Sequence, residues 1–182
     1  AMGFFIGVIM CINKNEELLP YYERAKEVLN YNEQTGIFVR FIKSRNTYEE
    51  AGVINGSGYR QISISVNGNR KILRAHRLAW FMAYGELPNI IDHIDHNKLN
   101  NRISNLRSCT HQQNKFNQGK YSNNTSGFKG VSFRKPNKKW MAQIAQDGKI
   151  IYLGSFNCPQ EASRAYEAKA RELFGDYYSS II

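Results

Sequence analysis

The sequence from Ile90 to Asn114 reads IIDHIDHNKLNNRISNLRSCTHQQN and is rich in histidine, aspartate and asparagine. These 25 residues include three histidines, two aspartates and five asparagines, together with apolar residues at regular intervals. A solvated loop does not need regular apolar residues, and an apolar core does not accept so many polar ones. The pattern therefore predicts a compact site built from two short strands and a helix.

Local signals divide this stretch into a strand, a broad turn, a return strand and a helix. The two strands are expected at residues 90–93 and 106–109. Thr110 and Gln113 form a capping box, in which a hydroxyl residue is followed three positions later by Glu or Gln. A helix should therefore begin at His111, with Asn114 about one turn further along on the same face.

The net charge of +10 is concentrated around this stretch. Residues 70–139 hold fourteen Lys/Arg against three Asp/Glu, whereas residues 1–69 hold seven of each. Residues 140–182 hold four against five. A solvating surface does not need such a concentration, so a polyanionic partner is predicted. No long amphipathic basic helix is visible, so a membrane is not expected as a partner.

The cysteines and the N-terminal residues indicate a folded protein of a reducing compartment. Cys11, Cys109 and Cys158 are odd in number and far apart, which argues against a disulfide framework or a cysteine zinc site. The apolar run at residues 4–12 is too short to span a bilayer and lacks the features of a signal peptide. We therefore expect a cytoplasmic protein.

Residues before the central stretch predict a small antiparallel sheet accompanied by helices. Residues 4–12 suit either a strand or an optional N-terminal extension. Alternation at residues 60–66, the turn Asn67-Gly68-Asn69 and residues 71–74 predict a β-hairpin. His76 and Arg77, at the start of the next helix, suit either phosphate contact or a structural role. The remaining expected elements are a helix at 16–29, a strand at 37–42 and a helix at 76–84.

Residues after the central stretch predict a linker and a second domain. Residues 115–126 are polar and lysine-containing, without apolar periodicity, and suit a linker along a phosphate backbone or an ordinary hinge. Three strands are expected at 128–134, 139–145 and 150–156, followed by a helix with a stripe of small residues between Pro159 and Gly175. The fold class is therefore α+β. The expected divisions are an N-terminal extension (1–20), a first domain (21–117) with its core at 90–117, a basic linker (118–126) and a second domain (127–178).

The residue types in the central stretch suit metal-assisted attack at phosphorus. Asp92 and Asn114 offer oxygen ligands to a hard cation, too few for a closed cage but suited to loosely held Mg²⁺ or Mn²⁺. His93 should point away from Asp92 because neighbouring strand residues face opposite sides. A histidine near its ordinary pKa of about 6.5 is a suitable general base for water.

The same residues resemble a known nuclease motif. Asp92-His93, Asn105 twelve residues later and Asn114 a further nine residues on resemble the His-Asn-His (HNH) homing and phage endonucleases. The resemblance implies a ββα-metal finger that cleaves DNA with one divalent ion, in the cytoplasm of a bacterial or phage-infected cell. It implies Asp92 and Asn114 as metal ligands, His93 as general base, and Asn105 as the residue that holds the loop and orients the base. Many relatives have histidine at the last position, so His111 is an alternative ligand or a phosphate contact.

Residues 126–166 resemble the plant ethylene-response-factor (Apetala-two) DNA-binding domain. The resemblance is carried by Ser126–Arg134, Lys139–Ile144, Tyr152–Phe156 and Glu161–Tyr166. It implies that the three-stranded sheet enters the major groove of DNA. Ser132 replaces the usual arginine, so a different target sequence is expected. Positions implied in DNA contact are Lys129, Arg134, Trp140, Gln143, Lys149 and Tyr152, with Lys138 and Lys139 on phosphates. A core-packing role for Trp140 is an equal alternative.

Together these patterns predict a metal-dependent endonuclease that binds double-stranded DNA through its C-terminal domain. One ββα site should cut one strand, so a monomer should nick DNA, and cleavage of both strands would need a homodimer or two sequential events. A non-catalytic DNA-binding regulator is the main alternative. A structural zinc module is disfavoured by the scattered cysteines.

Overall fold

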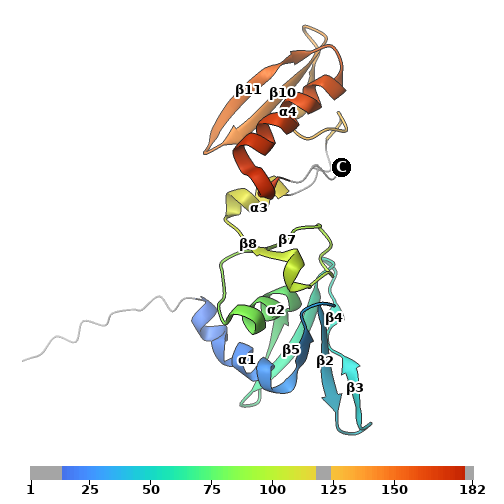
Figure 1. Cartoon of the computed structure of the whole chain (residues 1–182), viewed down its shortest axis with the longest axis vertical. Helices are drawn as coiled ribbons and strands as arrows, with labels where there is room; N and C mark the ends of the chain where they lie inside the picture. Colours follow the sequence, from blue (N-terminus) through green and yellow to red (C-terminus); the bar gives the residue numbers. More distant parts are fainter. Residues whose placement is uncertain (1–13, 118–123, 179–182) are drawn as a thin grey trace, which may run out of the picture. The chain divides into compact units, whose positions relative to one another are not determined.

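A computed structural model describes residues 14–117 and 124–178 of the chain (Figure 1). The chain forms two compact units, the first from residues up to 93 together with 97–107, the second from residues 94–96 together with those from 108 onward. The strand or extension expected at 4–12 lies outside the described residues, as does most of the expected linker at 118–126. No helix among the described residues is long and apolar enough to cross a membrane.

The first unit combines helices with small antiparallel sheets. Strands β1, β2 and β3 form one sheet in that order, β4, β5 and β6 form another, and β7 pairs with β8. The predicted hairpin is confirmed, with Ile62 of β5 opposite Leu73 of β6. The elements are α1 (Lys14–Val28), β1 (Asn30–Asn32), β2 (Ile37–Ile42), β3 (Thr47–Glu50), β4 (Val53–Ile54), β5 (Arg60–Val66), β6 (Asn69–Arg74), α2 (Ala75–Tyr84), β7 (Ile91–His93), the 3-10 helix η1 (Ile103–Asn105) and β8 (Leu106–Ser108).

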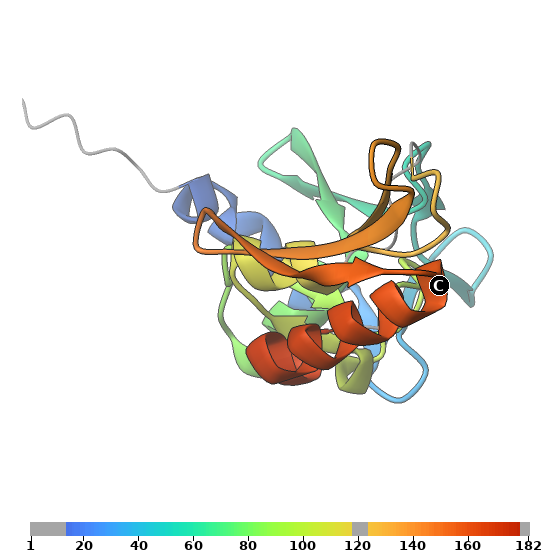
Figure 2. The same cartoon turned by 90° about the horizontal axis from the view of Figure 1, so that it is seen from above.

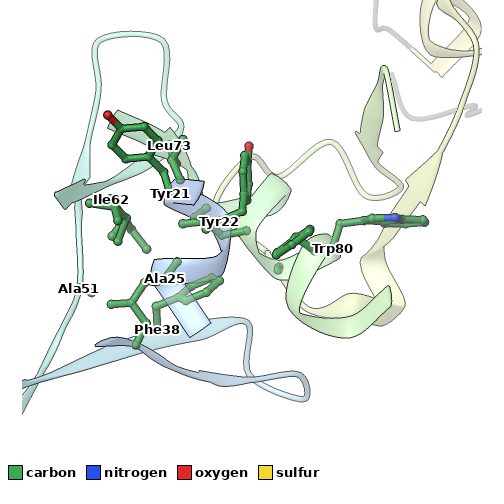
Figure 3. Packing of buried hydrophobic residues seen from close by; sticks show 14 of the residues in the cluster. Tyr21, Tyr22, Ala25, Phe38, Ala51, Ile62, Leu73 and Trp80 are labelled. Atoms are coloured by element: carbon green, nitrogen blue, oxygen red, sulfur yellow. The ribbon is translucent and has the colours of Figure 1, made fainter. Parts of the chain in front are cut away.

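The core of the first unit lies where α1 and α2 pack against β5. Figure 3 shows Ala25 of α1 beside Phe38 and Ile62 from the strands, whereas the Tyr22 ring of α1 packs against Phe81 of α2, with ring centroids 5.2 Å apart. Helix α2 is buried over most of its circumference and ends at Gly85, whose left-handed backbone (φ 72°) lets its N–H reach Phe81 O at 2.9 Å. Each large apolar side chain buried here contributes roughly 1.5–3 kcal/mol. The core includes Ala75, the first residue of α2, and Ile91, the first residue of β7, so it helps to position both elements.

The sequence predicted one small sheet before the central stretch, whereas the structure has two. Residues 30–36 carry turn residues, yet Asn30–Asn32 pair with β2 before the turn begins. The Asn32 side chain accepts the N–H groups of Gln34 and Thr35 at 3.0 Å, which explains the turn signal. Strands β1, β3 and β4 were missed because they are short and have no apolar alternation.

The second unit contains the predicted three strands and one helix. Its elements are α3 (His111–Asn117), β9 (Val131–Arg134), β10 (Lys139–Gln146), β11 (Lys149–Phe156), α4 (Pro159–Phe174) and the 3-10 helix η2 (Gly175–Tyr177). The antiparallel sheet has the order β11-β10-β9, and α4 runs along one face of it (Figure 2). The predicted stripe of small residues is confirmed, because Ala162 and Ala170 are fully buried against the strands. The α+β class is confirmed.

The first strand of this sheet is shorter than predicted because of Gly130. The sequence predicted a strand from Phe128, but Gly130 has φ +69° and β9 begins only at Val131. A Cβ on Gly130 would lie 2.1 Å from the ring of Tyr166. Gly130 therefore provides both the turn into β9 and the space for the buried Tyr166 of α4.

Replacement of Gly130 by alanine should destabilise the second unit beyond the ordinary cost of a left-handed backbone. Gly148→Ala is a matched control, because Gly148 has φ +77° and open space around its Cβ position. We expect the control to lower the free energy of unfolding by about 1–2 kcal/mol. Gly130→Ala should cost about 1–3 kcal/mol more, because the Tyr166 ring must move. Urea unfolding measures both, and equal losses would contradict the packing role of Gly130.

Candidate functional site

Strand β7 presents Asp92 and His93 as neighbours. Asp92 is largely buried, with 11% of its side chain exposed, and its Oδ2 accepts two hydrogen bonds from Arg107 of β8. Arg107 Nη2 lies at 3.0 Å from that oxygen and Nε at 3.2 Å. Two charge-assisted bonds from a planar guanidinium fix the orientation of the carboxylate. Arg107 is thus the residue that orients the Asp92 carboxylate.

The ring of His93 is buried and is held by Asn101. The exposed fraction of His93 is 5%, and its Nε2 lies 3.2 Å from Oδ1 of Asn101. The Asn101 amide nitrogen donates to Leu99 O at 3.3 Å, which assigns the orientation of the amide. Because Oδ1 can only accept, the neutral ring carries its proton on Nε2 and its lone pair on Nδ1.

The loop that contains Asn101 is attached to the first sheet. The Tyr31 hydroxyl of β1 donates to Asn101 O at 2.7 Å, and burial raises the pKa of Tyr31, so it stays a donor. Ile103 N donates to Glu33 O at 3.2 Å. A Cβ on Gly36 would lie 2.6 Å from the backbone carbon of Asn101, so the β1–β2 turn and the loop are in close backbone contact. Residues far apart in sequence therefore hold the loop beneath His93.

Asn105 lies at the end of η1 and is buried. Its amide nitrogen donates to Asn100 O at 2.8 Å, across the base of the same loop. The hydrogen bond between a side-chain amide and the His93 ring described above comes from Asn101. The predicted role of Asn105 in orienting the base stays a prediction.

An aromatic cluster packs against the His93 ring. The His76 ring meets the His93 ring edge-on, with ring centroids 5.1 Å apart. The centroid of the Tyr59 ring lies 5.4 Å from that of His76 and 6.1 Å from that of His93. Burial, with the neighbouring charges of His93 and Arg74 as smaller causes, lowers the pKa of His76 to about 3. His76 is therefore a neutral packing partner of His93 at physiological pH.

Arg77 also has structural contacts. Its Nη1 donates to Pro88 O at 2.9 Å and to Asn89 O at 3.3 Å, across the connection that leads to β7. Of the two roles left open for His76 and Arg77, the structure supports the structural one.

Helix α3 carries the other predicted metal ligands. The capping box is confirmed: Gln113 N donates to Thr110 Oγ1 at 3.2 Å, and Thr110 N donates to Gln113 Oε1 at 2.8 Å. His111 is exposed and Asn114 is half-buried, both in the second unit. That Asp92 and Asn114 share a metal ion stays a prediction, as does the alternative with His111.

The described segments, 14–117 and 124–178, contain no group of three or more His, Cys, Asp or Glu that could hold a metal ion. A zinc site of that composition is therefore not found within them. Asp92 remains an oriented, largely buried oxygen donor, and such a donor fits a hard divalent cation that completes its shell with water and substrate.

Comparisons with known proteins place this site in a family. Residues 73–116 match a family model described as HNH endonuclease. Protein 3.8 of Escherichia phage T7 is 34% identical over 109 residues, which cover 59% of this chain and 89% of that protein. The chain belongs to the HNH endonuclease family.

Other similar proteins carry the same family name. An uncharacterized HNH endonuclease (L560) of Acanthamoeba polyphaga mimivirus is 34% identical over 108 residues, or 58% of this chain, and the matched part is 55% of that protein. This chain thus spans about half the length of that relative. A structure titled as DNA binding and cleavage by the HNH homing endonuclease I-HmuI is 26% identical, covers 75% of this chain and 76% of that chain, and has a TM-score of 0.43.

Two contacts in this member of the HNH endonuclease family were not assigned from its sequence. Arg107 and Asn101 both lie in the quoted stretch, yet neither was given a role. Arg107 could have been found from the expected strand pairing, because a residue on the return strand can face Asp92. Asn101 gave no such signal, because it is one of several asparagines in a loop of irregular backbone.

Only some of the predicted DNA-contacting residues lie on the face of the second unit's sheet that points away from α4. Ala142 and Ile144 of β10 belong to the core clusters under α4, so the alternate residues of β10 face away from the helix. Strand pairing places Arg134 opposite Lys139, and Tyr152 opposite Gln143. Those four residues therefore share the face that α4 leaves open, which is called the open face below.

The other four predicted contacts lie elsewhere. Trp140 packs against the core and against Phe133, with ring centroids 5.0 Å apart, which supports the core alternative. Lys138 lies in the β9–β10 turn, and Lys149 is on the α4 side by strand alternation. Lys129 precedes β9 and is partly buried, and burial lowers its pKa to about 8. Contact with DNA by these four residues stays a prediction.

The buried His76 should make the first unit sensitive to acid. The unfolded chain binds a proton at this position below pH 6.5, whereas the folded chain does so only near pH 3. Between these values the unfolded state binds more protons, so the free energy of unfolding falls as the pH falls, by up to about 1.4 kcal/mol per pH unit for this group. Urea unfolding of the wild type and of His76→Gln across this range should show a weaker pH dependence in the variant. His111→Gln, at an exposed position, serves as the control, and identical profiles for wild type and His76→Gln would contradict the assignment.

Proposed function

We propose that this HNH endonuclease hydrolyses phosphodiester bonds of double-stranded DNA with one divalent cation, Mg²⁺ or Mn²⁺. The observation that carries the proposal is the adjacency of Asp92 and His93 on β7, each hydrogen-bonded to a partner of its own, Arg107 and Asn101. Such a pair provides a cation ligand and a base that point in different directions, as attack at phosphorus requires.

Asp92 would bind the cation together with Asn114, or with His111 as the alternative to Asn114. The cation would supply Lewis-acid stabilisation of the charge that develops on the phosphate and the leaving oxygen. Arg107 would keep the Asp92 carboxylate in its orientation, since residues that hydrogen-bond a ligand fix its geometry.

His93 would activate the attacking water through Nδ1, because Nε2 donates to Asn101. The water oxygen forms a bond to phosphorus as its proton moves to Nδ1, and the bond from phosphorus to the leaving oxygen breaks. The imidazolium that results is stabilised by the side-chain oxygen Oδ1 of Asn101, which lies 3.2 Å from Nε2. By analogy with the family, the products would carry 5′-phosphate and 3′-hydroxyl ends.

The second unit would supply affinity for DNA through its open face. Arg134 and Lys139 offer positive charge there, and Gln143 and Tyr152 offer hydrogen bonds and an aromatic surface. A single site per chain would cut one strand, so a monomer would nick and a homodimer could cut both strands.

Loss of His93 should abolish cleavage while leaving DNA bound. We expect His93→Ala and His93→Gln to relax supercoiled plasmid at least about 100-fold more slowly than wild type in Mg²⁺ or Mn²⁺, because a positioned general base contributes about 10²–10⁴. DNA binding, measured by fluorescence anisotropy, should be unchanged. Thermal unfolding checks that both variants fold, because His93 is buried. A wild type that binds DNA but never relaxes plasmid with any divalent ion would falsify the nuclease and favour a non-catalytic DNA-binding regulator.

Arg134→Ala should weaken DNA binding through the open face. If Arg134 contacts one phosphate, the slope of log affinity against log salt should become shallower by about 0.9. Arg164→Ala is the matched control, because Arg164 is exposed on α4, which covers the opposite face of the sheet. Anisotropy titrations at several salt concentrations measure both. Equal slopes for Arg134→Ala and wild type would remove the argument for a DNA-binding open face.

A further inference from the structure

Two cationic side chains pack against one aromatic ring next to His93. The guanidinium carbon of Arg74 lies 4.7 Å from the centroid of the Tyr59 ring, and Lys98 Nζ lies 4.9 Å from it. The centroid of the same ring is 6.1 Å from that of His93. Tyr59 immediately precedes β5, Arg74 ends β6 and Lys98 lies in the loop after β7, so the fold of the first unit brings them together.

Neither cation has a carboxylate partner among residues 14–117 and 124–178. Lys98 Nζ donates to the backbone carbonyl of Ser57 at 3.1 Å, and both cations are exposed. Six other cations of the first unit form ion pairs with acids: Arg24–Glu27, Lys26–Glu23, Arg45–Glu49, Arg60–Glu50, Lys71–Glu17 and Arg107–Asp92. Two like charges held close to one ring repel each other, and an anion bound between or beside them removes that cost.

We propose that Arg74, Lys98 and Tyr59 form a binding site for DNA phosphates that flank the scissile one. This inference rests on the proposed function, because it takes His93 as the base. A strand whose scissile phosphate meets the base must carry its next phosphates past the side chains around that base. A guanidinium and an ammonium without acidic partners are the groups that receive such phosphates.

Tyr59 acts as the support of this site. Cation–π contact holds both charged groups in place before DNA arrives, which reduces the side-chain entropy lost on binding. Contact of the same ring with His93 and His76 ties the position of the bound strand to the position of the base. The site would therefore set the register of the strand relative to His93, in addition to its contribution to affinity.

The test compares the double variant Arg74→Gln/Lys98→Gln with a control of identical charge change, Arg70→Gln/Lys43→Gln. Arg70 and Lys43 are exposed residues of the first unit and have no ion pair among the described residues. The probe is a linear double-stranded DNA, titrated by anisotropy between about 50 and about 200 mM salt. We expect the Arg74/Lys98 variant to lose about two phosphate contacts, so the slope of log affinity against log salt should become shallower by about 1.8. The loss of affinity over this salt range should then be about tenfold smaller than in wild type. The control should keep the wild-type slope.

Variants of Tyr59 test whether the ring holds the two cations in place, without changing the charges themselves. Tyr59→Phe should behave as wild type, whereas Tyr59→Leu should weaken DNA binding and slow plasmid relaxation, with folding checked by urea unfolding. An unchanged salt slope in the Arg74/Lys98 variant, or an equal change in the control, overturns the phosphate site. Plasmid relaxation by the wild type is scored separately. If it fails while the slope still depends on Arg74 and Lys98, DNA binding at this cluster stands and the nuclease proposal fails.

Discussion

A buried side-chain amide must find its hydrogen bonds inside the protein, and the loop between β7 and β8 is built around that requirement. The Asn101 amide spans from the His93 ring to the Leu99 carbonyl, and the Asn101 carbonyl accepts from Tyr31. An unmade bond at such a position costs about 1–3 kcal/mol, so the loop has one favourable arrangement. The ring of His93 is oriented because the backbone beneath it is fixed.

A second constraint comes from the largely buried ion pair between Asp92 and Arg107. A carboxylate with little exposure is tolerated because the guanidinium compensates its desolvation, and removal of one partner from such a pair typically costs 3–5 kcal/mol. The pair also joins β7 to β8, so the same contact that orients a proposed cation ligand stabilises the two-stranded sheet. Stability and site geometry are therefore not independent in this region.

Features encoded by neighbouring residues could be predicted from the sequence. The Thr110–Gln113 cap, the β5–β6 hairpin and the small-residue stripe of α4 depend on residues a few positions apart, and the structure confirms all three. Contacts between distant residues could not be predicted, since Tyr31 and Asn101 are 70 positions apart. Gly130 shows a third case: its sequence context suits a strand, but the buried Tyr166 ring needs the space a side chain would take.

The attachment of the loop to the first sheet limits how the segment that matches the HNH family can be transplanted. The segment that matches the HNH family model begins at residue 73, but Tyr31, Glu33 and Gly36, which hold the loop, precede it. A fragment trimmed to that segment would retain Asp92, His93 and Asn114 and lose the support of the loop. The portable piece for grafting onto a DNA-binding protein is therefore the whole first unit together with α3, rather than the motif alone.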